Sequence, residues 1–251
     1  MVYVNSNNPQ FVYLNKFISF DDVQQYIYKQ YPPLVIIGSA GSGKTAILLE
    51  KIKQLEGQIL YVTLSSFLVK NSRELYYSEH YYNENQLVDF YSYQEFLESI
   101  AVPSQNIADI DYFMSWYKAN YKHKFSAHSI YEEFKGVLTG AMTDQAYLSE
   151  QGYLALGVKQ SIFHVDERAE VYAIFKHYLQ DLEKQNLADL NILSYDYLSK
   201  VKPSYDFVVI DEVQDITAIQ LYLILNSLSQ KGLFLMCGDA NQIVHPNFFS
   251  W

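Results

Sequence analysis

A short glycine-rich stretch constrains the fold of this chain more than any other feature. Eight consecutive residues follow the pattern G-x-x-x-x-G-K-T, which is typical of a phosphate-binding loop. They are Gly38, Ser39, Ala40, Gly41, Ser42, Gly43, Lys44 and Thr45. An apolar, β-branched run at 34–37 precedes them and a helical pattern at 45–55 follows. This order predicts an α/β fold in which the loop joins a buried parallel strand to a helix.

The composition of the loop indicates what it binds. Its glycines let the backbone turn tightly and direct several N–H groups at one anion. The start of the following helix adds the positive end of its dipole. Lys44 can then reach the β- and γ-phosphates of a nucleotide, and the Thr45 hydroxyl can hold Mg²⁺. The alternative is a glycine-rich turn that binds nothing, and the agreement of motif and flanks disfavours it.

The overall composition excludes several classes of protein. Of the 251 residues, 49% are hydrophobic, which indicates a globular chain. The net charge of −10 argues against a histone-like, charge-driven nucleic-acid binder. Cys237 is the single cysteine, so no internal disulfide can form and we expect a reducing cytoplasm. The first residues lack the pattern of a signal peptide, and no apolar run approaches the roughly 20 residues of a membrane span, so we expect no membrane partner.

Strand and helix patterns divide the chain into three segments. Further strands are predicted at 58–63, 87–91, 205–210 and 232–237. Between 103 and 199 the alternation of strands and helices stops and the pattern is mostly helical. We therefore expect an α/β domain built from 1–102 and 200–251, interrupted by a helical insertion at 103–199. In the insertion, Asp166 is a candidate cap for a helix whose apolar face would carry a stripe of core residues: Val171, Phe175, Tyr178 and Leu182.

Two acidic residues follow the predicted strand at 205–210. In this kind of sheet, a carboxylate at the end of such a strand lies beside the phosphate loop. Asp211 can hold Mg²⁺ through water, and Glu212 is placed to orient and deprotonate an attacking water. The alternative is an ordinary acidic loop. After the last strand, Gln242 is a neutral amide that can sense a γ-phosphate.

Other polar and aromatic residues are candidates for nucleotide or nucleic-acid contacts. A helix is expected between a Ser19 cap and the Pro32-Pro33 pair, and its Gln24 can pair with the edge of adenine. An exposed helix glutamine is the equally open alternative. Hydroxyls and aromatics at strand ends and near the end of the chain can contact a nucleic-acid backbone or stack on bases, although helix caps and core positions use the same residue types. These are Thr63, Ser65, Ser66, Ser92, Tyr93, Phe248 and Trp251.

Taken together, these motifs resemble the first half of a superfamily 1 DNA helicase of the UvrD/Rep/PcrA type. Gly38–Thr45 resembles motif I, and Asp211-Glu-Val-Gln-Asp215 is similar to motif II. Gly238-Asp-Ala-Asn-Gln242 resembles motif III. The 20–24 stretch is similar to the family's adenine-contacting motif, and 63–66 is similar to its motif Ia. The order and approximate spacing match over nearly the whole chain.

The resemblance implies a RecA-like P-loop NTPase domain, called 1A, interrupted by a helical insertion, called 1B. It implies ATP-driven translocation on single-stranded DNA. By this resemblance, Gln24 would contact adenine, Lys44 and Thr45 would serve phosphate and Mg²⁺, and Asp211 would also serve Mg²⁺. Glu212 would be the catalytic base, and Gln242 would couple the γ-phosphate to DNA.

The sequence departs from the family pattern in several places. Ala46 stands where many relatives have arginine, and Leu64 stands where a stacking phenylalanine is common. The sequence ends in the region of motif III, so we expect the second RecA-like domain to be absent from this chain. The isolated chain is then expected to bind Mg-ATP but to hydrolyse it weakly.

Two other functions stay open at this point. An ATP-binding regulatory module would use the insertion to hold a protein partner, and the acidic composition favours it slightly. A small-molecule kinase or GTPase is a weaker alternative, because the N-K-x-D guanine signature is missing and neither class needs motif III.

Overall fold

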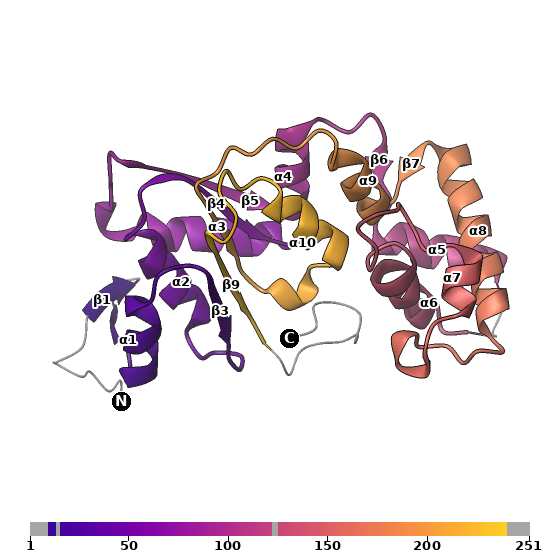
Figure 1. The fold of residues 1–251 in the computed structure, drawn as a ribbon, viewed down its shortest axis with the longest axis horizontal. Helices are drawn as coiled ribbons and strands as arrows, with labels where there is room; N and C mark the ends of the chain where they lie inside the picture. Colours follow the sequence, from indigo (N-terminus) through magenta and orange to yellow (C-terminus); the bar gives the residue numbers. More distant parts are fainter. Residues whose placement is uncertain (1–9, 14–15, 122–124, 240–251) are drawn as a thin grey trace. The chain divides into compact units, whose positions relative to one another are not determined.

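The computed structural model describes residues 10–13, 16–121 and 125–239, which fold as two compact units (Figure 1). The first unit takes the described part of Met1–Phe96, Lys202–Val213 and Ser227–Gln242. The second takes the described part of Leu97–Val201 and Gln214–Asn226. Residues 214–226 thus group with the helical unit, whereas the sequence pattern assigns them to the α/β segment 200–251.

The first unit is an α/β unit with a parallel sheet. Its elements, in chain order, are β1 Gln10–Tyr13, β2 Lys16–Ser19, α1 Asp22–Lys29, β3 Leu34–Ile37, α2 Lys44–Ile52, β4 Gly57–Thr63, α3 Ser66–Tyr76, η1 Ser78–His80, β5 Gln86–Ser92, β8 Phe207–Ile210 and β9 Phe234–Gly238. Five of the strands form one sheet in the order β3-β9-β8-β4-β5, and every pair in it is parallel. This confirms the predicted α/β class and all five predicted strands.

The central strands of this unit are buried almost throughout, and alternate residues of the strands form a core on one face of the sheet. Alternate strand residues such as Ile59, Val209 and Leu235 pack in one cluster with Leu48 of α2 and Val69 of α3. Side chains of a strand point alternately to the two faces of the sheet, so one face of the sheet faces α2 and α3. The phosphate loop leaves β3 at the carboxyl edge and leads into α2.

The second unit is mostly helical, as the sequence pattern predicts. Helix α4, Tyr93–Ile100, leads into it. Its other elements are β6 Asn106–Ile107, α5 Ile110–Asn120, α6 Ala127–Glu133, the π-helical η2 Phe134–Leu138, α7 Glu150–Leu154, η3 Val158–Gln160, α8 Arg168–Gln185, β7 Leu187–Ala188, α9 Leu190–Tyr197, η4 Val213–Asp215 and α10 Ala218–Leu225. The predicted stripe on α8 is confirmed as core, since its four side chains are at most 4% exposed.

Two predicted helix caps are wrong. Helix α1 is capped by Asp21, whose side chain accepts from the Gln24 N–H at 2.8 Å, while Ser19 ends β2. Helix α8 begins after Glu167, which makes no side-chain capping bond, and not after Asp166. In both cases several capping residue types lie next to each other, so the local pattern is met by more than one position.

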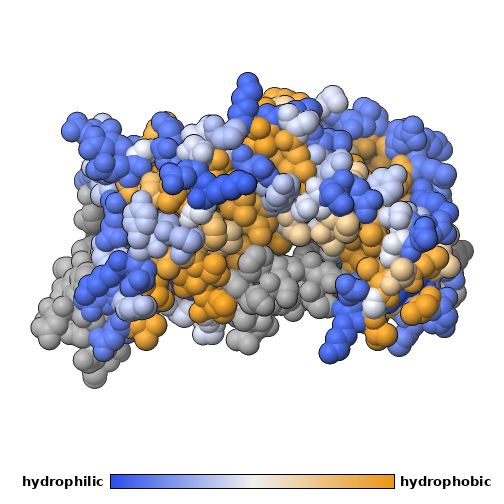
Figure 2. All heavy atoms as spheres, viewed as in Figure 1, coloured by the Kyte–Doolittle hydropathy of each residue, from blue (hydrophilic) through white to orange (hydrophobic). Residues whose placement is uncertain are grey.

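The surface of the described residues is mixed in character. Figure 2 shows hydrophobic side chains among hydrophilic ones on the face viewed in Figure 1. On the edge strand β3, for example, Val35 and Ile37 are 46% and 53% exposed. Among the helices of the described ranges, none has both the length and the apolar composition that a bilayer crossing requires.

Candidate functional site

The phosphate loop adopts a backbone that only glycine adopts easily. Gly41 and Gly43 have φ angles of +75° and +77°, in the left-handed region that penalises a Cβ atom. A Cβ on Gly38 would lie 2.7 Å from the Ser42 Oγ. The Gly38 N–H donates to the Gly238 carbonyl at 3.2 Å, which ties the start of the loop to the end of β9. The glycines therefore keep the inside of the loop free for an anion.

Lys44 is directed into the loop and not toward solvent. Its side chain is 7% exposed, and its Nζ donates to the carbonyls of Gly38 at 3.0 Å and Ser39 at 2.9 Å. An ammonium has three N–H donors, so one is left for a ligand. The lysine is thus held in place beside the loop before any anion arrives.

A cavity of about 320 Å³ opens in front of the loop. Its lining residues are Ala40, Gly41, Ser42, Gly43, Lys44, Thr45, Glu212 and Asp239. The lining thus joins loop backbone N–H groups and a cation with two carboxylates. A Cβ on Gly38 would press on the side chain of Ser42, which lines this cradle, and backbone N–H groups at the start of a helix suit a phosphate group.

Asp211 is the most highly bonded side chain of the site. Its Oδ2 accepts from the Thr45 hydroxyl at 2.7 Å and from the Tyr61 hydroxyl at 2.8 Å. Its Oδ1 accepts from the Cys237 thiol at 2.7 Å and from the Glu212 N–H at 3.0 Å. The side chain is only 3% exposed. These four bonds compensate for the burial of the carboxylate.

The two side-chain donors of the sheet that face Asp211 stay protonated. Burial is the main reason why the pKa of the Tyr61 hydroxyl lies well above its usual value, and the nearby Asp211 raises it further. Burial and the same carboxylate also raise the pKa of the Cys237 thiol. Both groups therefore donate to Asp211 over the physiological pH range.

The donor set at Thr45 and Asp211 suits Mg²⁺. The cation prefers hard oxygen ligands, keeps several waters and usually takes one or two carboxylates from the protein together with phosphate oxygens. The two oxygen donors already lie within 2.7 Å of each other. Thr45 and Asp211 would hold the cation, as the sequence predicts.

Glu212 has a backbone conformation that is uncommon for its residue type. Its φ angle is +53°, in the left-handed region, which is costly for a residue with a Cβ. Its N–H is used by Asp211, and its side chain lines the cavity. Such strain persists only where the surrounding structure enforces it, and it gathers at functional sites. The carboxylate of Glu212 thus lies at the cavity of the phosphate loop.

Gln24 lies against the phosphate loop. Its Nε2 donates to the Ser42 carbonyl at 2.9 Å, and its Oε1 accepts from the Asp21 N–H at 2.9 Å. One N–H and one lone pair of the amide are left. The structure therefore places Gln24 next to the cavity, with part of its amide already used by the cap of α1.

The candidate nucleic-acid contacts are in different environments. Thr63 and Ser92 end the paired strands β4 and β5 and are buried, and the Thr63 Oγ1 has no hydrogen-bond partner. Ser65 accepts from the Leu68 N–H and thereby caps α3, and Ser66 is exposed at the first position of that helix.

Tyr93 packs against Phe96 and is fully buried, which leaves no face exposed for a base in this structure. Three further predicted residues, Gln242, Phe248 and Trp251, lie outside the described residues.

Sequence reasoning missed three residues at the site. Asp239 lines the cavity directly after β9, and motif III contains it without assigning it a role here. Tyr61 and Cys237 lie inside strands, where the pattern marks them only as buried. The available signal was that each places a hydrogen-bond donor within or directly after a run of buried apolar strand residues.

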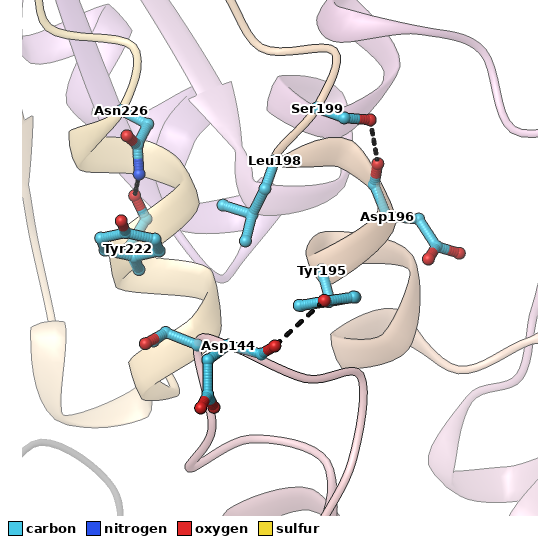
Figure 3. A pocket seen from close by; sticks show the side chains of 8 residues that line it. Asp144, Tyr195, Asp196, Leu198, Ser199, Tyr222 and Asn226 are labelled. Atoms are coloured by element: carbon cyan, nitrogen blue, oxygen red, sulfur yellow. Dashed lines mark hydrogen bonds between the residues drawn. The ribbon is translucent and has the colours of Figure 1, made fainter.

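A second cavity, of about 450 Å³, lies in the helical unit between α9 and α10 (Figure 3). Tyr195 and Leu198 face it from the end of α9, and Tyr222 and Asn226 face it from α10. The Tyr195 hydroxyl donates to the Asp144 carbonyl at 3.1 Å. None of the residues predicted to be functional from the sequence lines this cavity.

Comparison with known protein families identifies the family of this chain. The family model of the UvrD/REP helicase N-terminal domain matches residues 21–246 of this chain. The match includes the phosphate loop, Gln24 and the Asp211-Glu212 pair, and it extends through the helical unit.

Proposed function

This chain belongs to the family of UvrD/REP helicase N-terminal domains, and we propose that it is the ATP-binding and single-stranded-DNA-contacting part of a UvrD-like superfamily 1 helicase. The full-length protein would couple ATP hydrolysis to translocation on DNA and to unwinding. One observation carries the nucleotide part of the proposal. Thr45 and Asp211 are 166 positions apart in the sequence, yet their side chains meet at 2.7 Å beside the cavity of the phosphate loop.

Each residue of the site has a role in this proposal. The loop N–H groups and Lys44 bind the phosphates, and Thr45 and Asp211 hold Mg²⁺, which offsets the phosphate charge. In hydrolysis, a water oxygen bonds to the γ-phosphorus while the bond to the β–γ bridging oxygen breaks. Glu212 accepts the proton that this water loses. Gln24 contacts adenine, and Gln242 couples the γ-phosphate to DNA.

We propose that the 251 residues by themselves hydrolyse ATP weakly. Among the described residues that line the cavity there is no arginine. An arginine that stabilises charge on the transferred phosphoryl group contributes a factor of about 10³ to 10⁵ in rate. In the family, the second RecA-like domain supplies such arginines.

The α/β and helical units correspond in this proposal to domains 1A and 1B. The single cysteine supports a cytoplasmic protein.

The test measures nucleotide binding and hydrolysis in three chains. Lys44→Ala should lower the affinity for Mg-ATP by about 10-fold to 100-fold, because a charge-assisted hydrogen-bond donor is lost. Glu212→Gln should keep the affinity of the unmodified chain and remove whatever hydrolysis single-stranded DNA stimulates. Unchanged nucleotide affinity in Lys44→Ala would show that the site assignment is wrong.

One observation favours the alternative of a module that holds a protein partner. In the segment 154–165, which we call the apolar loop, Val158, Val165 and Ile162 are 78%, 58% and 45% exposed. Exposed apolar side chains within one short segment are a feature that interaction sites use. Single-stranded DNA affinity at low salt would favour the motor. A protein partner that is lost in a Val158→Asp, Ile162→Asp double variant, with no DNA affinity, would favour the module.

A further inference from the structure

Two side chains, Tyr61 and Cys237, donate hydrogen bonds to the carboxylate of Asp211, although neither has a role in binding or hydrolysing the nucleotide. Asp211 directly follows β8, and β8 lies between β9 and β4 in the sheet. Cys237 belongs to β9 and Tyr61 belongs to β4, so each neighbouring strand contributes one side-chain donor to the same carboxylate.

Packing alone does not explain these two donors. Tyr61 and Cys237 belong to the cluster on the sheet face that packs against α2 and α3, whose other members are almost all apolar. Phenylalanine and alanine would fill nearly the same space without a polar atom. Because a carboxylate only accepts, the Tyr61 hydrogen must go to Asp211, and Ser72 then donates to the Tyr61 oxygen at 2.9 Å.

Of the four hydrogen bonds to Asp211, only one comes from the other residue that is expected to hold the cation. A carboxylate offers about four lone-pair positions. Tyr61, Cys237 and the Glu212 N–H occupy three of them. The fourth, on Oδ2, accepts from the hydroxyl of Thr45, which is the other expected oxygen ligand.

We propose that Tyr61 and Cys237 are positioning residues of the cation site, which hold the Asp211 carboxylate so that the lone pair bonded to the Thr45 hydroxyl is directed at the place where Thr45 and Asp211 would hold the cation. Neither residue touches the cation. They act through Asp211, as groups behind a metal ligand commonly do. The inference rests on the proposed function, because it assumes that Thr45 and Asp211 serve the Mg²⁺ that accompanies the nucleotide.

The test separates binding of nucleotide from its dependence on Mg²⁺. The probe is adenylyl imidodiphosphate, a non-hydrolysable ATP analogue, titrated without Mg²⁺ and at increasing Mg²⁺ concentrations. Tyr61→Phe and Cys237→Ala should raise the Mg²⁺ concentration for half-maximal tightening of binding by about 10-fold to 100-fold. The affinity measured without Mg²⁺ should stay that of the unmodified chain.

Two control variants separate positioning from packing. Tyr76→Phe removes a buried hydroxyl of the same unit that bonds Gln86 and not Asp211, and it should leave the Mg²⁺ dependence unchanged. Cys237→Ser keeps a donor to Asp211 and should restore most of the Mg²⁺ response that Cys237→Ala loses.

The outcomes distinguish this inference from the function on which it rests. Tyr61→Phe and Cys237→Ala chains that bind with an unaltered Mg²⁺ dependence would overturn the positioning role alone. The positioning role would also be overturned if Tyr76→Phe shifted the Mg²⁺ dependence as much as Tyr61→Phe, or if Cys237→Ser shifted it as much as Cys237→Ala. An unmodified chain that does not bind the analogue under any condition would overturn the proposed function itself.

Discussion

Two loops of this molecule share a structural feature, a buried cation that bonds to their backbone carbonyls, but they have different roles. In the α/β unit, the first residue of α2 is Lys44, which bonds two carbonyls of the phosphate loop. In the helical unit, the first residue of α8 is Arg168, which bonds the carbonyls of Leu156, Gly157 and Phe163 in the apolar loop. In each case a buried cation at the start of a helix holds the loop before it.

The difference lies in what surrounds the cation. Arg168 is fully buried, and three carbonyls use its guanidinium. Lys44 keeps one donor free beside a cavity that glycines leave open. A buried cation on loop carbonyls is therefore not in itself the sign of a ligand site. An oriented carboxylate is not the sign either, because Glu133 accepts from the Ile162 N–H of the apolar loop at 3.0 Å. Glycines with positive φ beside an open cavity are what distinguish the phosphate loop.

The largest effect on folding is expected from Arg168→Ala. The substitution leaves three loop carbonyls without their donor and opens a cavity in the core, which should lower the free energy of unfolding by about 3 kcal/mol or more. Denaturant unfolding followed by circular dichroism measures this loss. Arg168→Met, which fills the space without a donor, should recover only the packing part. A variant as stable as the unmodified chain would show that the loop does not depend on this cation.

A smaller effect is expected from Gly41→Ala. The φ angle of +75° makes any side chain cost about 1–2 kcal/mol there, although nothing lies within 4 Å of the added Cβ. The matched control is Gly232→Ala, at φ +92° with equally open surroundings. Both variants should lose similar stability, but only Gly41→Ala should bind nucleotide more weakly. Equal nucleotide affinity in the two variants would show that Gly41 is not part of the nucleotide site.

The smallest effect is expected from Glu150→Gln. Glu150 pairs with Lys176 at 3.0 Å in the helical unit, but the two side chains are 47% and 53% exposed. Water screens such a pair, so its loss should change the free energy of unfolding by less than about 1 kcal/mol. Thermal unfolding at low and high salt provides the measurement. A loss comparable to that of Arg168→Ala would show that exposure does not weaken this ion pair.

Local patterns determined a large part of this protein. The phosphate loop, its flanking strand and helix, the five parallel strands, and the helical character of 103–199 all follow from residue types within a few positions of each other. Such features depend on backbone sterics and on the spacing of apolar residues, which a linear sequence displays directly. The family resemblance drew on the same motifs, and the family match confirms it.

Tertiary structure alone decided how the site is assembled. The strand order places Asp211 between Tyr61 and Cys237 and brings it to Thr45 from the other end of the sequence. Periodicity marks Tyr61 and Cys237 as buried, but it does not say which carboxylate they meet. Local sequence thus specifies the helices, strands and loops, and long-range packing specifies which of their side chains meet. The sequence does not display these contacts, because they join residues whose separation in the chain carries no periodic signal.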